Sequence, residues 1–141
     1  NADLDTLVGI WSYNAPAIVD IVTQLKRRKD FTIVTFDAEP VAVEHMKNNM
    51  IDAMAVQNPH AMGYEGVRLL KALITGDKAA HAAMEKRMNR TEEKDLFDTG
   101  LKIIIPDEGS PLADTKFGEN TDKLSLSKFT EWLKSKGLQG S

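Results

Sequence analysis

Residues 51–64, IDAMAVQNPHAMGY, decide the fold of this chain. Their apolar run, residues 53–56, has the length of a buried β-strand. Pro59 cannot donate a hydrogen bond to a sheet, so we expect the strand to end before it. Asn58 followed by this proline is typical of a helix start, because asparagine caps the first turn and proline fits the first helical position. Gln57 therefore falls at the carboxyl end of a strand, where ligands bind in open α/β sheets.

The same strand-to-helix arrangement occurs twice upstream. Residues 7–11, LVGIW, and residues 31–36, FTIVTF, each predict a strand, and Pro16 and Pro40 lie near the helix starts that follow. Strands joined by helical crossovers pair in parallel, which predicts an α/β fold with a doubly wound, mainly parallel sheet. The carboxyl ends of parallel strands meet at one edge, so three polar side chains are expected there: Asn14, Asp37 and Gln57.

The remaining elements follow from hydrophobic periodicity and from breaker residues. We expect helices over residues 15–28, 40–49, 60–74 and 125–136, a short helix and then a loop within residues 78–93, a fourth strand over residues 101–105, and a surface loop over residues 107–122. Pro106 is expected to end the fourth strand, and Gly137 to end the last helix.

Two local patterns carry expectations of their own. Residues 26–29, KRRK, are interpreted as cations that complement the dipole at a helix C-terminus, with a phosphate or nucleic-acid contact as the alternative. Gly63 and Gly66 lie inside a predicted helix, where each costs about 1 kcal/mol relative to alanine. We therefore expect that helix to pack closely against another backbone.

Composition narrows the function classes. The chain has 141 residues, 42% of them hydrophobic, which suffices for a sizeable core. A net charge of −3 disfavours a general nucleic-acid binder, which would show a basic excess. Without cysteine, neither disulfides nor thiolate metal sites can form. The chain begins at Asn1 almost directly before a strand, and we expect further sequence upstream.

Catalytic signatures are missing from the sequence. It contains no GxxxxGK, GxGxxG, GxSxG or HExxH pattern. The three histidines, His45, His60 and His81, are isolated and lack metal-ligand spacing. We therefore expect a protein that is not an enzyme and that holds neither a cofactor nor a metal.

The predicted sheet edge offers a different chemistry. Its polar residues Asn14, Asp37 and Gln57 stand beside the aromatic residues Trp11, Tyr13 and Phe36. A carboxylate accepts hydrogen bonds from adjacent hydroxyls, and an amide both donates and accepts them. Aromatic faces pack on the C–H groups of a sugar ring, so a neutral polyol or sugar is the expected ligand. Local roles are the alternative: Asn14 as a helix cap, Asp37 in a turn, and Gln57 at a strand end.

Three motifs in order carry a resemblance to a known family. Residues 13–17, YNAPA, then Phe36-Asp37, then residues 56–59, VQNP, with Gly63-Tyr64, resemble the C-terminal half of type I periplasmic sugar-binding proteins. The ribose-binding branch of the ABC-transporter solute receptors is the most similar in pattern. The resemblance runs from about residue 4 to residue 106. It implies two doubly wound lobes that enclose a sugar in the cleft between them.

The resemblance also implies residue roles. Asn14, Asp37 and Gln57 would be sugar ligands, Phe36 would lie beside the ring, and Trp11 and Tyr13 would lie near it. Gln57, Asn58 and Pro59 would form a hinge crossing. Residues 1–57 would belong to the second lobe, residues 58–106 to the first, and residues 107–141 to a return segment with the terminal helix. An ABC-transporter permease would be the partner, in the periplasm or as an exported, membrane-associated protein.

Residues 78–96 are longer than the family pattern, and the tail from Asp107 has no clear counterpart in it. The effector-binding domain of a lactose-repressor-type transcription regulator shares the fold and is the alternative function. An enzyme of Rossmann-like fold is disfavoured, because the strand-to-helix turns lack glycines that could hold a phosphate. Since the lobe that would contain residues 58–106 is incomplete, we expect the chain to self-associate or to dock against a missing segment.

Overall fold

The structure, a computed structural model, describes residues 3–89 and 96–141. The chain divides into two compact units, one formed by Asn1–Gln57 with Leu101–Ser141 and the other by Asn58–Gly100. The loop expected at the end of residues 78–93 lies partly outside the described residues.

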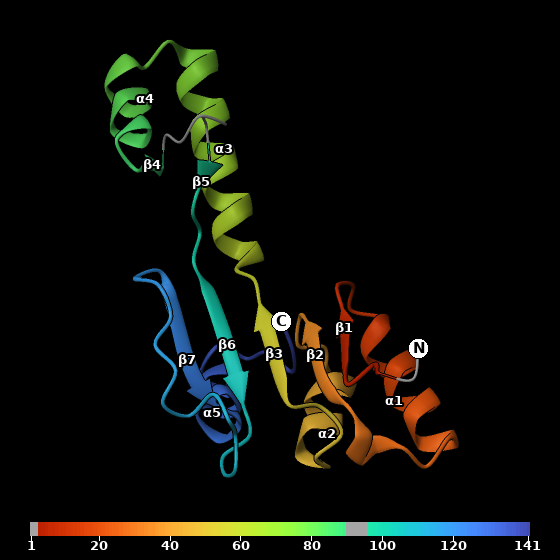
Figure 1. The fold of residues 1–141 in the computed structure, drawn as a ribbon. Helices are drawn as coiled ribbons and strands as arrows, with labels where there is room; N and C mark the ends of the chain where they lie inside the picture. The colour runs from red at the N-terminus through yellow and green to blue at the C-terminus, as the bar shows by residue number, and fades with distance from the viewer. Residues whose placement is uncertain (1–2, 90–95) are drawn as a thin grey trace. The chain divides into compact units, whose positions relative to one another are not determined.

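A five-stranded sheet forms the centre of the first unit, in the order β1-β2-β3-β6-β7 (Figure 1). Its strands are β1 (Thr6–Gly9), β2 (Thr32–Phe36), β3 (Ala53–Val56), β6 (Leu101–Ile105) and β7 (Thr121–Ser125). The pairs β1–β2, β2–β3 and β6–β7 are parallel, whereas β3 and β6 run antiparallel. The predicted α/β fold with a mainly parallel sheet is thereby confirmed.

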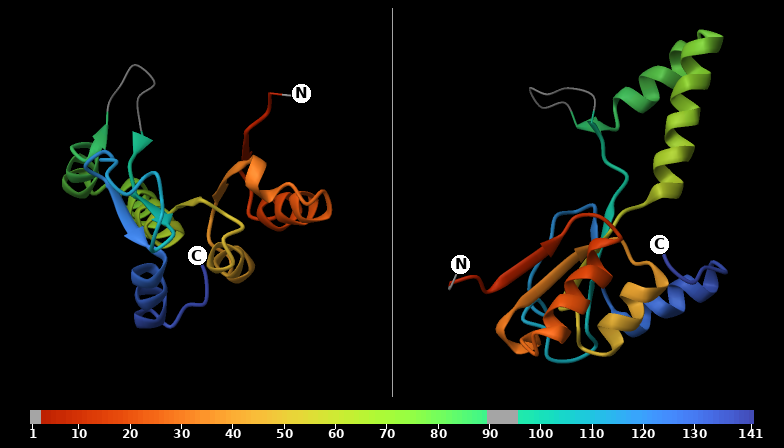
Figure 2. Two further views of the ribbon diagram at one scale, coloured as in Figure 1. Left: turned by 60° about the horizontal axis from the view of Figure 1, so that its bottom comes forward. Right: turned by 90° about the vertical axis from the view of Figure 1, so that its right-hand side faces the viewer.

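Three helices form one layer against this sheet (Figure 2). They are α1 (Asn14–Gln24), α2 (Pro40–Lys47) and α5 (Leu126–Ser135), and α2 contacts both of the others. The core between helices and sheet contains the fully buried side chains of Ile33, Met54, Ile104 and Phe129. Ser125 caps α5, because its hydroxyl accepts a hydrogen bond from the Lys128 N–H.

Strand residues that alternate with the core positions point to the opposite face of the sheet. Val34 and Phe36 lie there half-buried, and Val8 of the edge strand β1 is exposed. Within the described part of the first unit, the helices α1, α2 and α5 all pack on the other face (Figure 2). This open face is therefore largely apolar and has no helical layer of its own.

The second unit contains α3 (Pro59–Thr75), α4 (Lys78–Glu85) and the short antiparallel strands β4 (Met88–Asn89) and β5 (Leu96–Phe97). Asn58 caps α3 as expected, since its Oδ1 accepts a hydrogen bond of 3.0 Å from the Ala61 N–H. Gly76 ends α3 in the left-handed conformation, with φ of 66°. The Asp77 side chain then caps α4 through the Ala80 N–H.

The boundary after the second unit differs from the sequence-based expectation. Residues 101–105 were expected within the segment 58–106, but β6 pairs with β3 on one side and β7 on the other. The boundary therefore falls at Gly100. The strands β4, β5 and β7 were not predicted, and β7 begins at Thr121, inside the expected surface loop.

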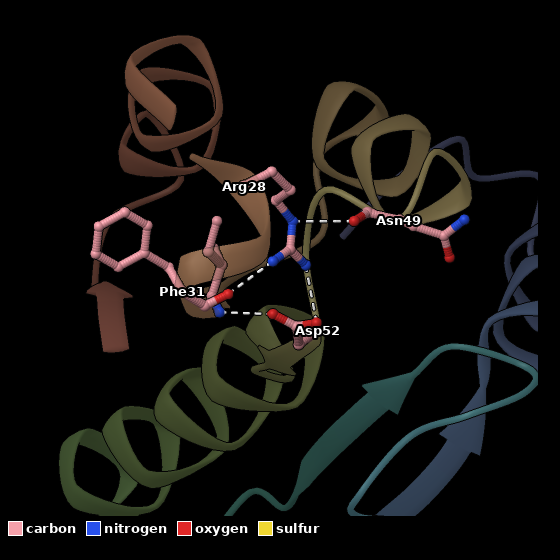
Figure 3. A network of polar contacts seen from close by, with 5 residues as sticks. Arg28, Phe31, Asn49 and Asp52 are labelled. Carbon is pink, nitrogen blue, oxygen red and sulfur yellow. Dashed lines mark hydrogen bonds and ion pairs between the residues drawn. The ribbon is translucent and has the colours of Figure 1, made fainter. Parts of the chain in front are cut away.

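The interpretation of the basic cluster at residues 26–29 was wrong. Helix α1 ends at Gln24, and Arg28 instead opens the short 3-10 helix η1 (Arg28–Asp30). Its guanidinium donates hydrogen bonds to Asn49 O, Phe31 O and the Asp52 carboxylate, at 3.0, 2.7 and 2.8 Å (Figure 3). The other Asp52 oxygen accepts from the Ile33 N–H at 2.7 Å. Arg28 thus ties the starts of β2 and β3 to the end of α2.

The close packing expected at Gly63 and Gly66 is also absent from the described residues. A Cβ added at either glycine would meet no heavy atom within 4 Å. Several large apolar side chains of α3 are exposed, among them Val67, Leu70 and Ile74.

Candidate functional site

The carboxyl ends of β1, β2 and β3 lie side by side at one edge of the sheet. Gly9 is in register with Thr35, and Phe36 with Ala55. The turn after β1, the residue after β2 and the residue after β3 are therefore neighbours in that order. The structure places the three expected polar residues at these positions: Asn14, Asp37 and Gln57.

Asn14 closes the turn between β1 and α1. Its Oδ1 accepts a hydrogen bond of 2.9 Å from the Trp11 N–H, and its own N–H donates to Trp11 O at 2.8 Å. The helix-cap alternative was wrong, because the cap position of α1 is Tyr13, which makes no side-chain cap bond. Among the described residues no protein acceptor is found for the Asn14 Nδ2 group, so this half-buried amide retains donors for a ligand.

Gly9 permits this arrangement, and sequence reasoning missed its role. A Cβ at this position would meet the Asn14 Cβ at 2.8 Å and the Ile18 Cδ1 at 3.2 Å. Only glycine lets the start of α1 lie this close to β1. A glycine within an apolar strand pattern was the available signal, since it often marks a close backbone approach.

Asp37 has an unusual backbone and an unusual carboxyl group. Its φ of 63° lies in the left-handed region, which residues other than glycine rarely adopt. The Asp37 N–H donates to Ala55 O at 2.9 Å and so extends the pairing of β2 with β3. Burial, and secondarily the negative charge of Glu39, raise the pKa of the Asp37 carboxyl above its ordinary value. No protein donor among the described residues bonds this carboxylate, which leaves its oxygens available.

Gln57 is exposed and directly follows the buried Val56 at the end of β3. The next residue, Asn58, begins the second unit and uses both ends of its amide. Besides capping α3, it donates from Nδ2 to Thr99 O at 3.4 Å. Asn58 lies where the chain enters the second unit and Thr99 where it leaves, so this hydrogen bond joins the two ends of that unit.

The three aromatic residues of the prediction differ in exposure. Trp11 and Tyr13 lie on the turn after β1 and are 62% and 66% exposed. Phe36, at the end of β2, is half-buried on the open face of the sheet. The edge therefore presents aromatic surface next to polar groups, a combination that suits a ligand with both C–H and hydroxyl faces.

Across residues 3–89 and 96–141, no group of three or more His, Asp or Glu side chains is placed to hold a metal ion. The helices of these same residues include none long and apolar enough to cross a membrane.

An open α/β sheet with polar and aromatic residues at the carboxyl ends of its parallel strands defines a class of small-ligand-binding folds. The chain belongs to the periplasmic binding protein domain family, whose model matches residues 1–78.

Among solved structures it is similar to GanP, a glucose-galactose binding protein from Geobacillus stearothermophilus. The two share 26% sequence identity with a TM-score of 0.51, over 54% of this chain and 27% of that protein. The matched part of the chain thus spans only about a quarter of the length of GanP, 27%. No curated protein sequence matches the chain.

Proposed function

We propose that the chain is part of a sugar-binding protein that captures a monosaccharide between two lobes, without chemistry, for an ABC-type importer. The observation that supports this most directly is the unpaired, half-buried Asp37 carboxylate between Asn14 and Gln57 on one sheet edge. Membership of the periplasmic binding protein domain family and similarity to a glucose-galactose binding protein agree with it.

Each edge residue then has a distinct role. The Asp37 carboxylate accepts hydrogen bonds from adjacent sugar hydroxyls, and the Asn14 Nδ2 group donates to a third oxygen. Gln57 does both from the end of β3. Phe36 packs against a C–H face of the ring, and the exposed rings of Trp11 and Tyr13 close over its side.

The chain passes from one unit to the other at two places, and these two connections suit a hinge. Gln57, Asn58 and Pro59 form one crossing, and Gly100 marks the return. We assign residues 58–100 to the other lobe of the receptor. Its partner would be a membrane permease, and its location the periplasm or, as an exported and membrane-associated protein, the outer surface of a membrane.

Calorimetric titration of the complete protein with D-glucose, D-galactose and D-ribose tests the proposal. One of these sugars, or a related monosaccharide, should bind with micromolar or tighter affinity. Small-angle scattering should show the protein becoming more compact when that sugar is added. Failure of every monosaccharide to bind, together with binding of a nucleotide or a DNA operator, would show that the function lies elsewhere.

A further inference from the structure

The segment after α5 returns to the sheet edge that bears Asp37. The Ala38 N–H donates to Ser141 O at 2.6 Å, and the Ser141 N–H donates to Ala38 O at 2.9 Å. This reciprocal pair joins Ser141 to the residue directly after Asp37. Figure 1 accordingly shows the C label close to the arrowheads of β2 and β3.

Gly140 fits this position because it has no side chain. An added Cβ would meet Ala38 O at 2.6 Å, Pro40 Cδ at 2.7 Å and Pro40 N at 3.0 Å. Two of these atoms belong to the backbone and the third to a rigid ring, so none can rotate away. Glycine is needed here for space, and any larger residue must push segment 137–141 away from Ala38.

The segment is anchored at its other end as well. Gly137 leaves α5 with φ of 69°, and the Leu138 N–H donates to Leu133 O at 2.9 Å. Leu133 is a core residue, only 2% exposed. The path from the core through Gly137 to Ser141 is therefore short and fixed at both ends.

We infer that Gly140 is a positioning residue: it lets the backbone of the last residue, whatever its side chain, pair with Ala38 and so holds the Asp37 carboxylate in its ligand-binding geometry. A left-handed residue other than glycine persists only where its surroundings determine it. At Asp37 these surroundings are two backbone contacts: the Asp37 N–H bonds β3 through Ala55 O, and the adjacent Ala38 pairs with Ser141. The role in sugar binding rests on the proposed function, whereas the backbone pairing does not.

The test compares Gly140→Val with Ser141→Ala in the complete protein. Gly140→Val should separate the segment from Ala38, so the Ala38 amide should exchange with solvent at least tenfold faster by NMR. Its affinity for whichever of D-glucose, D-galactose and D-ribose the unmodified protein binds should fall at least tenfold. Ser141→Ala retains both backbone hydrogen bonds, so its amide exchange and its affinity should match those of the unmodified protein.

The outcomes separate the two proposals. If the unmodified protein binds no sugar, the proposed function fails, and Ala38 exchange still decides whether Gly140 holds the pairing. If Gly140→Val releases Ala38 but binds sugar as before, the positioning role is overturned. Unchanged Ala38 exchange in Gly140→Val overturns the pairing itself. Gly140→Ala, with a smaller clash, provides the same comparison if the valine variant does not fold.

Discussion

Asp37 combines a strained backbone with an unpaired carboxylate, and substitutions can separate the two. Asparagine tolerates the left-handed conformation, whereas alanine pays about 1–2 kcal/mol there. Asp37→Asn should therefore keep the melting temperature, and Asp37→Ala should lower it. Both should weaken sugar binding at least tenfold, because alanine removes both acceptor oxygens and asparagine replaces one of them with a donor. A sugar hydroxyl left without its acceptor costs about 1–3 kcal/mol. Calorimetry and thermal unfolding measure the two effects; Asp114→Asn, in an exposed loop, is the control. Unchanged affinity in Asp37→Asn would remove this residue from the site.

The pKa of Asp37 gives a pH dependence with opposite signs for folding and binding. Because burial raises this pKa above 3.8, protonation favours the folded state. The Asp37 contribution to the free energy of unfolding is therefore fully present below pH 3.8 and is lost as the pH rises through the raised pKa. Sugar binding needs the ionised acceptor, so affinity should decrease as the pH falls through the same pKa. Asp37→Asn should lack this decrease in calorimetric titrations across that range.

The strand-end residues could be predicted from the sequence, but their local geometry could not. The positions of Asn14, Asp37 and Gln57 at one edge follow from strand length and helix-start signals, which act over neighbouring residues. Whether the Asn14 side chain bonds forward into α1 or back to the Trp11 N–H depends on how closely α1 approaches β1. That distance is set by Gly9 and Ile18, which the local pattern alone does not bring together.

At the scale of elements, Arg28 joins β2, β3 and α2 through one guanidinium. Its side chain and that of Asp52 are 21% and 34% exposed, so the pair is partly shielded from solvent. Arg28→Met leaves two carbonyls and a carboxylate without their donor and should lower the free energy of unfolding by about 1–3 kcal/mol.

The adjacent Arg27 provides a matched control for this prediction. Its ion pair with Asp30 is about half exposed, at 53% and 49%, and an exposed pair contributes about 0–1 kcal/mol. Arg27→Met should therefore change the urea midpoint much less than Arg28→Met. Equal effects of the two substitutions would show that the Arg28 network does not stabilise the junction of these elements.

Elements with strong local signals were predicted, and those that depend on distant partners were not. Helix α3 lies within one residue of its expected limits at each end, because Asn58, Pro59 and Gly76 mark them. Strand β7 was missed, because its sequence TDKLS is mostly polar and its pairing with β6 connects residues 20 positions apart. The placement of β6 beside β3 depends on the return of the chain from the second unit, which no local pattern specifies.

At the scale of the whole molecule, two apolar surfaces are exposed. One is the open face of the sheet, where Val8 is exposed but Val34 and Phe36 are half-buried. The other is the face of α3 that includes Val67, Leu70 and Ile74, at 66%, 59% and 82% exposure. Contiguous apolar surface of this kind favours association. A single sheet edge also cannot enclose a sugar, and burial of most of the ligand is what tight small-molecule sites require. Residues 1–141 alone are therefore expected to self-associate and to bind sugars weakly.

Sedimentation of the isolated chain tests this expectation and locates the surface. The unmodified chain should form dimers or larger species whose population rises with concentration. Val67→Glu with Leu70→Glu should shift the chain toward monomer, because charges placed on the α3 face must be desolvated in any contact. Lys116→Glu changes the net charge by the same amount at an exposed loop position outside α3 and should leave association unchanged. If the double variant associates as before, the open sheet face is the contact surface. If the isolated chain is instead a monomer that binds a monosaccharide with micromolar affinity, the assignment of its residues to two lobes, one of them incomplete, is wrong.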